Sequence, residues 1–221
     1  MQFKAYSDVR AVPTCQHFGV CGGCKWQNLP YEAQLAAKQQ QVVDQLTRIG
    51  KVELPLVSPI LGSMKVLGYR NKLEFGCANK RWYTAEELAA LPPRTEDGAG
   101  HLNDSAIGFH ITGAFDKIYP IEKCWLMDDL QNRIRNEIYR YAVAEQLSFY
   151  DIKAQHGLLR SLMMRNSNTG EFMLLVQFHY DAPDDAERAE KLFEHVAQTF
   201  PEISSLLYVD NQKGNDTFAD L

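Results

Sequence analysis

Three cysteines stand within ten positions near the N-terminus of this 221-residue chain: Cys15, Cys21 and Cys24. Gly22 and Gly23 separate the last two. Because glycine has no Cβ, its backbone can take positive φ and its N–H groups can approach the sulfurs closely. A C-x₂-C pair around such a turn points two sulfurs at one centre, and the x₅ spacing brings in a third. Three convergent thiolates hold a metal and need one more ligand from elsewhere, so the spacing predicts a metal site.

The fourth ligand is predicted from the surroundings of the remaining candidates. Cys124 lies in an expected loop just before a helix, where its side chain can reach another segment. Cys77 lies on the apolar face of an alternating strand, which is the setting of an inert core thiol. We therefore expect Cys124 to be the ligand rather than Cys77 or His17. Spacing alone leaves zinc and iron–sulfur open, because tight C-x₂-C pairs hold both.

Composition is that of an ordinary globular protein with one or two domains. Hydrophobic residues make up 45% of the chain and charged residues 23%. No apolar run approaches the roughly 18–20 residues of a membrane helix. The first residues lack the apolar stretch of a signal peptide. Five cysteines without an export signal point to a reducing compartment, so we expect a cytoplasmic protein without a membrane partner.

Charge is divided unevenly along the chain. The net formal charge is −5, yet residues 1–83 hold 11 Lys and Arg against 5 Asp and Glu, a local +6. Residues 84–221 hold 12 against 23, or −11. Such asymmetry is typical of a nucleic-acid-binding face, although two differently solvated surfaces would produce it too. The basic half is the one that contains the cysteine cluster.

Hydrophobic periodicity predicts an α+β fold. Three main helices are expected, over residues 30–49, 128–146 and 184–200, each with an apolar stripe. Strands are expected over residues 69–79, 105–112, 158–165, 171–180 and 204–210. Asn168, Thr169 and Gly170 predict a hairpin turn between two of them, and residues 91–104 read as a long polar loop. We expect a largely antiparallel sheet with an N-terminal metal-cluster loop.

Several motifs resemble one enzyme family. The cysteine segment continues with Trp26, Gln27, Tyr31, Gln34 and Lys38, and resembles the iron–sulfur signature of the RNA uracil-5-methyltransferase family. Later segments resemble family motifs in the family's order: residues 69–75 (YRNKLEF), Gly108-Phe109 with residues 121–124, Leu159-Arg160 with Arg165 and residues 169–171, and Asn211 with Asn215. The resemblance extends from about residue 10 to the end of the chain.

The resemblance implies a 4Fe-4S cluster bound by Cys15, Cys21, Cys24 and Cys124. It also implies an S-adenosylmethionine-dependent enzyme that methylates C5 of uridines in RNA, with large-subunit (23S) ribosomal RNA as the expected substrate. In that family a cysteine adds to C6 of a uracil that has left its stack, and a base later removes the C5 proton. Since this chemistry needs no redox step, we expect the cluster to fix the N-terminal segment in place.

The chain departs from the family pattern on both sides of the motifs. About ten residues precede Pro13, where the family has a small RNA-binding barrel called the TRAM domain. The motifs of the S-adenosylmethionine-binding domain, the catalytic cysteine and the base are absent. We therefore expect the central part of a longer methyltransferase, inactive alone. Residues 1–29 are the expected cluster-binding segment and residues 30–221 the expected central RNA-binding domain.

Five residues are predicted to contact RNA. Arg70 and Lys72 share the polar face of an expected strand, which suits backbone phosphates. Phe18, Lys25 and Trp26 surround the cysteines and combine aromatic faces with charge, as in surfaces that stack unpaired bases. Arg70 and Lys72 could instead belong to a solvated strand face, and Trp26 could instead cover the core. The alternative function is a non-catalytic RNA-binding module with a structural Cys₄ zinc site, and in either case we expect a monomer.

Overall fold

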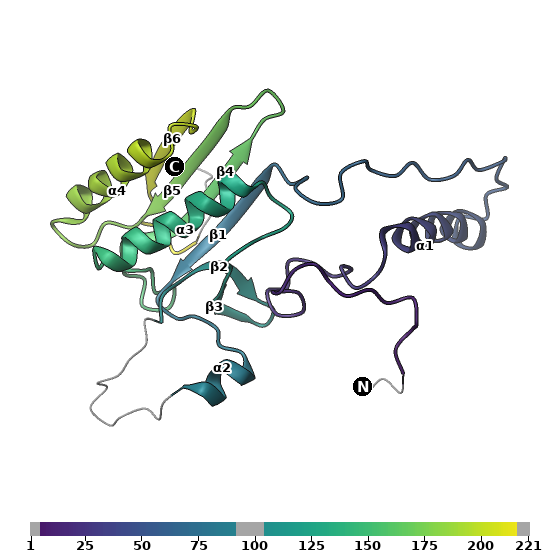
Figure 1. The fold of residues 1–221 in the computed structure, drawn as a ribbon, viewed down its shortest axis with the longest axis horizontal. Helices are drawn as coiled ribbons and strands as arrows, with labels where there is room; N and C mark the ends of the chain where they lie inside the picture. Colours follow the sequence, from purple (N-terminus) through teal and green to yellow (C-terminus); the bar gives the residue numbers. More distant parts are fainter. Residues whose placement is uncertain (1–4, 92–103, 216–221) are drawn as a thin grey trace.

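A six-stranded sheet forms the centre of the computed structural model, which describes residues 5–91 and 104–215 (Figure 1). The strands are β1 (Lys72–Ala78), β2 (Ala106–Ile111), β3 (Ala114–Pro120), β4 (Leu159–Asn166), β5 (Phe172–Phe178) and β6 (Ser205–Asp210). Their order across the sheet is β3-β2-β1-β4-β5-β6. Four neighbouring pairs are antiparallel and β5 with β6 is parallel. The sheet is therefore mixed, which corrects the expectation of a largely antiparallel one.

Helix α4 (Asp185–Thr199) is the physical reason for the parallel pair, because it carries the chain back along the sheet before β6 begins. Together with α3 (Asp129–Ala144) it covers one face of the sheet (Figure 1). The residues that the two helices bury against the strands are mainly apolar: Ile134, Ile138, Ala142, Ala189, Leu192 and Val196. The expected boundaries of both helices are confirmed to within two residues.

Strand β1 has the alternation that the sequence predicts. Leu73, Phe75 and Cys77 are buried, whereas Lys72 and Glu74 are exposed. The strand begins at residue 72 rather than 69, because the chain just before it is bound elsewhere. The N–H groups of residues 68 and 70 donate to the carbonyls of residues 125 and 126. The approach to β1 is thus held against the turn that precedes α3.

Two short elements are absent from the expectations. Helix α2 (Ala85–Ala90) makes four α-helices in the described chain instead of three. It begins at a capping box, in which Thr84 and Glu87 each accept the other's backbone N–H. Six residues are too few to show helical periodicity, so only the capping box could have predicted this helix from the sequence.

The second element that the sequence did not predict is the edge strand β3. The expected loop of residues 91–104 falls almost entirely outside the described residues.

Helix α1 (Tyr31–Asp44), continued by a π-helical turn (Gln45–Ile49), stands apart from the sheet (Figure 1). Its position agrees with the expected helix of residues 30–49, but none of its residues is buried. An extended segment, residues 50–71, runs beside it (Figure 1). Side-chain hydrogen bonds join α1 to this segment: Gln39 Oε1 accepts from the Ile60 N–H at 2.8 Å, Gln39 Nε2 donates to the Ser58 carbonyl at 3.2 Å, and Tyr31 Oη accepts from the Ser63 N–H at 2.7 Å. We call residues 31–71 the arm.

The arm exposes an unusual amount of apolar surface. Exposed large aliphatic side chains of the arm include Val42, Ile49, Leu56, Leu61 and Met64, and the last three are at least 95% exposed. So many exposed apolar side chains in one segment are typical of a surface that contacts a partner or another domain. Isolated helices of this length are also marginally stable in water without packing. None of the helices within residues 5–91 and 104–215 has the length and apolar character to cross a bilayer.

Packing of α3 on the sheet should dominate the stability of the described domain. Ile138 is fully buried in α3, whereas Val143 of the same helix is 37% exposed. We expect Ile138→Ala to lower the free energy of unfolding by about 2–5 kcal/mol, because it leaves a cavity under the helix. Val143→Ala should change it by no more than about 1 kcal/mol. Urea denaturation followed by circular dichroism measures both, and equal effects would contradict this account of the core.

Candidate functional site

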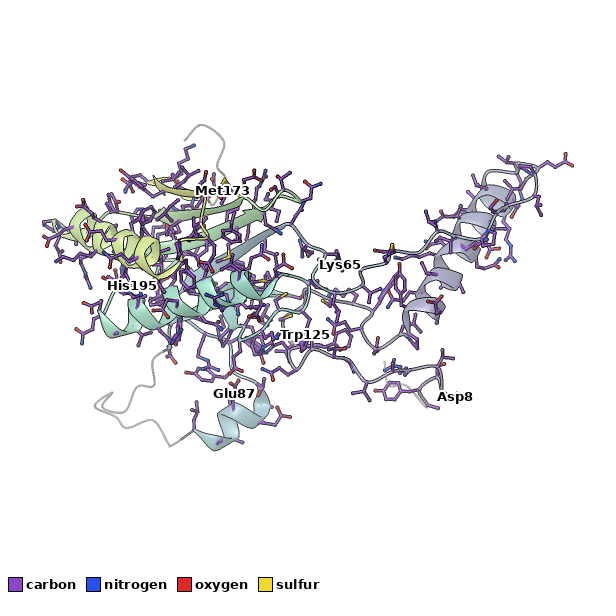
Figure 2. The ribbon with its side chains drawn as sticks, turned by 45° about the horizontal axis from the view of Figure 1, so that its top comes forward. Asp8, Lys65, Glu87, Trp125, Met173 and His195 are labelled. Atoms are coloured by element: carbon purple, nitrogen blue, oxygen red, sulfur yellow. The ribbon has the colours of Figure 1, made fainter. Side chains whose placement is uncertain are left out.

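Four cysteines line one cavity between the N-terminal segment and the sheet. Cys15, Cys21 and Cys24 come from the irregular chain before α1, and Cys124 comes from the turn before α3. Trp125, which Figure 2 labels where the N-terminal segment meets the sheet, lines it as well. All five cysteines of the chain are free thiols. The structure thus brings together the four predicted ligands and leaves the fifth cysteine elsewhere.

Cys77 lies in β1, 4% exposed, and belongs to the main apolar core. This is the placement expected of an inert core thiol. His17 lines the same cavity as the four cysteines, but its Nε2 accepts the Glu122 N–H at 3.2 Å. That nitrogen is therefore occupied by a structural hydrogen bond. Burial lowers the pKa of His17, which favours the neutral ring that this bond requires.

The cavity is small and is walled largely by sulfur and apolar side chains. About 20 Å³ is open to the centre of a water-sized sphere, which is room for one water molecule. A free organic ligand does not fit. A centre bonded directly to the sulfurs is the occupant that suits such a space, because metal–thiolate bonds of about 2.3 Å are much shorter than non-bonded contacts. Within the described residues, however, no three His, Cys, Asp or Glu side chains form a group that could hold a metal ion as they stand.

Donors are aimed at the sulfurs. The N–H groups of Gly23 and Cys24 donate to Cys21, and the N–H of Leu126 donates to Cys124. The side chain of Gln27 adds a bond to Cys24 Sγ at 3.2 Å. Each such bond favours the thiolate, but burial outweighs these bonds and raises the pKa of Cys21 and Cys124. A metal cation is the ligand that would reverse this balance, because it binds the deprotonated sulfur.

The turn around Gly22 takes the conformation that the sequence predicts. Its φ is +70°, a region that costs residues with a Cβ roughly 1–2 kcal/mol. A Cβ at this position would also come within 3.2 Å of Thr112 Oγ1, at the end of β2. Gly22 therefore allows the C-x₂-C pair to turn close against the sheet.

Helix α3 holds the fourth cysteine in place through polar side chains on its first turns. Asn132 Oδ1 accepts the Cys124 N–H at 2.7 Å, and Asn132 Nδ2 donates to the Cys124 carbonyl at 3.1 Å. One turn further, Arg135 and Asn136 both donate to the Glu122 carbonyl. With His17 bound to the Glu122 N–H, both backbone groups of that residue are used. Side-chain hydrogen bonds from α3 therefore hold the cysteine turn in place.

A larger groove opens beside the cysteine cavity, between the N-terminal segment and the arm. Its volume is about 870 Å³. Basic and aromatic side chains gather in its lining: Lys25, Trp26, Tyr31, Lys38, Lys65 and Tyr69. Trp26 is 48% exposed, and Lys38 Nζ lies 5.6 Å from its ring centroid. Exposed aromatic faces flanked by lysines suit unpaired nucleotides. We call it the basic groove.

The five residues predicted to bind RNA fall in different places. Lys25 and Trp26 line the basic groove, and Arg70 lines the cysteine cavity next to it. Lys72, the first residue of β1, lines neither space and forms an ion pair with Glu74 at 2.6 Å. Phe18 is half-buried in the cysteine segment and lines neither space. Arg70 and Lys72 therefore do not form the pair that the strand pattern predicted, because the strand starts only at Lys72.

Lys65 and Tyr69 were missed as candidate groove residues. They lie in the extended segment before β1, where neither helical nor strand periodicity groups them with Trp26. Lys38 belongs to the motif that follows the cysteines, but the sequence analysis did not predict that it would line an RNA-binding groove. The groove forms only because the arm folds back beside the N-terminal segment.

The sequence is similar to those of bacterial proteins about twice its length. A protein of Bacteroides thetaiotaomicron, named as an uncharacterized RNA methyltransferase, is 52% identical over 221 residues, which are all of this chain and 47% of that protein. One of Porphyromonas gingivalis with the same name is 46% identical over 226 residues, covering all of this chain and 46% of its own length. The chain is similar to bacterial proteins named as RNA methyltransferases. It spans about half the length of the curated relatives it matches.

The fold has a counterpart in a solved structure. The crystal structure of Pyrococcus abyssi tRNA (uracil-54, C5)-methyltransferase, in complex with S-adenosyl-L-homocysteine, matches 96% of this chain and 40% of its own. The TM-score is 0.55 at 23% sequence identity, which establishes a shared fold. No family model matches the chain.

The conformation of Gly22 leads to a testable difference between adjacent glycines. We expect Gly22→Ala to raise the rate of Cys21 alkylation in the metal-free protein about 5- to 30-fold, because roughly 1–2 kcal/mol of strain favours local opening. Gly23→Ala is the matched control, since its Cβ would lie 3.7 Å from Cys21 Sγ with no positive φ. Iodoacetamide labelling followed by mass spectrometry measures both rates. Equal rates in the two variants would contradict the proposed role of the turn.

Proposed function

We propose that this chain is the central, RNA-binding part of an S-adenosylmethionine-dependent methyltransferase acting on C5 of uridine, with 23S ribosomal RNA as its substrate class. The observation that carries the proposal is the convergence of Cys15, Cys21 and Cys24 with Cys124, 100 positions away, in a chain similar to proteins named as RNA methyltransferases. The fold shared with a tRNA uracil-C5 methyltransferase supports the choice of target atom. Methyl transfer itself belongs to residues outside the motifs found here, so the 221-residue chain alone should be inactive.

The exposed apolar surface of the arm suggests that it contacts another part of a longer protein. Its apolar side chains are exposed and its helix buries nothing within the described residues. The relatives contain roughly as many residues again as this chain spans. We therefore propose that the arm packs against that additional half. Residues 1–29 then bind the metal, and the sheet with α3 and α4 forms the rigid part of the proposed RNA-binding domain of residues 30–221.

A 4Fe-4S cluster is the metal centre that we propose for the four cysteines. Each thiolate of such a cluster binds a different iron, so its sulfurs stand farther apart than around one zinc ion. The four thiols line one cavity. The residues after the cysteine pair, from Trp26 to Lys38, resemble an iron–sulfur signature, which favours a cluster over the alternative of a structural Cys₄ zinc site. When bound, the cluster would supply a covalent link between the N-terminal segment and the turn before α3.

The basic groove is the proposed path of the RNA. It borders the cysteine cavity, sharing the lining residues Gly23, Cys24, Gln27 and Leu126 with it. Lysines supply attraction to phosphates that does not depend on sequence, and Trp26 and Tyr69 offer exposed faces for stacking. Arg70 lines the cysteine cavity beside the groove. Metal binding would thus fix one wall of the groove.

The first test of this function is the metal content of the purified protein. Under anaerobic conditions we expect iron with matching sulfide in the wild type and in Cys77→Ala, with an absorbance band near 400 nm typical of iron–sulfur proteins. Cys124→Ala should lose both iron and sulfide, because a ligand is missing. Stoichiometric zinc without sulfide would refute the cluster and favour the non-catalytic zinc module. Unchanged metal in Cys124→Ala would refute the ligand assignment.

The second test concerns the basic groove. We expect Trp26→Ala to weaken binding of a fluorescein-labelled oligouridine by about 1–3 kcal/mol, through lost stacking. Lys38→Ala should reduce the slope of log K against log salt concentration by about 0.7, through one lost phosphate contact. Fluorescence anisotropy of the metal-loaded chain measures both. Lys191→Ala, an exposed lysine of α4 paired with Glu187, is the control and should change neither quantity.

A further inference from the structure

Arg135 is the most unusual buried side chain of the domain. It lies in α3, is 1% exposed, and heads the fully buried residues by side-chain size. Its guanidinium lies 5.2 Å from the centre of the Phe75 ring. Nη2 donates to the Glu122 carbonyl at 2.6 Å and to Asn136 Oδ1 at 3.0 Å. Nε and Nη1 are buried without a hydrogen-bond partner, and no carboxylate of the described residues forms an ion pair with it.

A charge in this position is expensive unless an anion compensates it. Burial lowers the pKa of Arg135 to about 10, which still leaves it protonated at neutral pH. Removing an ion of this size from water costs several kcal/mol even after the protein relaxes. The cation–π contact with Phe75 and the hydrogen bond to the Glu122 carbonyl offset only part of this desolvation cost. The two unpartnered N–H groups therefore point to an anion nearby.

The cysteine turn is the site that can supply this anion. Arg135 is close enough to interact electrostatically with Cys124 and with His17, and the carbonyl it binds lies two residues before Cys124. A metal centre held by four thiolates carries net negative charge, because the thiolates outnumber the positive charges of the core. The imidazole of His17 cannot provide that charge, because it is neutral or positive but never negative at neutral pH.

We propose that Arg135 is the buried counter-charge of the four-cysteine centre, and that the metal-loaded thiolates are what make its burial favourable. This inference rests on the metal centre proposed above. Arg135 acts as a positioning and electrostatic residue: it holds the Glu122 carbonyl and stabilises charge on the sulfurs without binding the metal. Removing the charge weakens the loaded centre, whereas in the metal-free protein the same change removes an uncompensated buried cation.

The test compares three variants of the full chain, Arg135→Met, Arg135→Lys and Asn136→Ala, with and without metal. Arg135→Met removes charge and donor at similar size, and Arg135→Lys restores the charge. Asn136→Ala removes another donor to the same carbonyl, 3.0 Å from it, without altering charge. We expect Arg135→Met to release iron to a chelator about 10- to 100-fold faster and to shift the reduction potential to more negative values, because reduction adds negative charge.

Two further measurements distinguish an electrostatic role of Arg135 from a purely structural one. In the metal-free protein, Arg135→Met should unfold at a temperature equal to or above that of the wild type, since an unpaired buried charge is gone. Arg135→Lys should recover most of the metal retention, and Asn136→Ala should leave the reduction potential unchanged. Lower stability of Arg135→Met with and without metal, together with an unchanged potential, would overturn the inference while leaving the metal centre intact. A wild type that binds neither iron nor zinc would instead refute the centre itself, and this inference with it.

Discussion

The position of the N-terminal segment depends on the turn of residues 121–126. Residues 5–29 contain no helix or strand, so no backbone ladder fixes them to the sheet. Side chains do this instead: His17 binds the Glu122 N–H, and Gln16 Nε2 donates to the Glu122 carboxylate at 3.0 Å. The same turn receives the N–H groups of residues 68 and 70 on their way to β1. Both the cysteine cavity and the basic groove therefore exist only while this turn is in place.

The first turns of α3 explain why the turn of residues 121–126 is itself held firmly. A helix that covers a sheet normally buries only its apolar stripe. In α3 this stripe is Ile134, Ile138 and Ala142, but the first two turns also bury Gln131, Asn132 and Arg135. Asn132 and Arg135 bind backbone groups of the cysteine turn, whereas Gln131 accepts the Asp128 N–H and donates to Asn166 of β4. One helix thus packs on the apolar face of the sheet and also holds the turn that carries Cys124.

Much of the fold could be predicted from the sequence, because the sheet and its covering helices follow simple periodicities. Leu73, Phe75 and Cys77 alternate as expected, and the hairpin at residues 168–170 joins β4 to β5 with Gly170 at φ +101°. Cys124 could be paired with the N-terminal cysteines because it precedes a helix in a loop. The parallel placement of β6 could not be predicted, since direction depends on the path of α4 and not on the strand's own residues.

The surroundings of the site were harder to predict than its ligands. Arg135 does not disturb the apolar periodicity of α3, and an arginine in an amphipathic helix is usually assigned to the solvent side. Its burial therefore could not be predicted from the sequence. The stripe of Val42, Leu46 and Ile49 predicts a face to be covered, and the described chain leaves that face open. Arg70 was assigned to a strand face, although hydrogen bonds to another segment delay the start of β1. For Arg135 and Arg70 a contact with another segment overrides the local pattern.

The distance of 100 positions between Cys24 and Cys124 has a consequence for biosynthesis. At about 5–20 residues per second, a ribosome needs roughly 5–20 s to extend the nascent chain from one to the other. During that interval the three clustered thiols have left the tunnel ahead of the strands that will shield them. Nascent chains with exposed neighbouring thiols are open to disulfide formation and to capture of the wrong metal. Maturation of this protein is therefore most vulnerable to oxidants while it is still being translated.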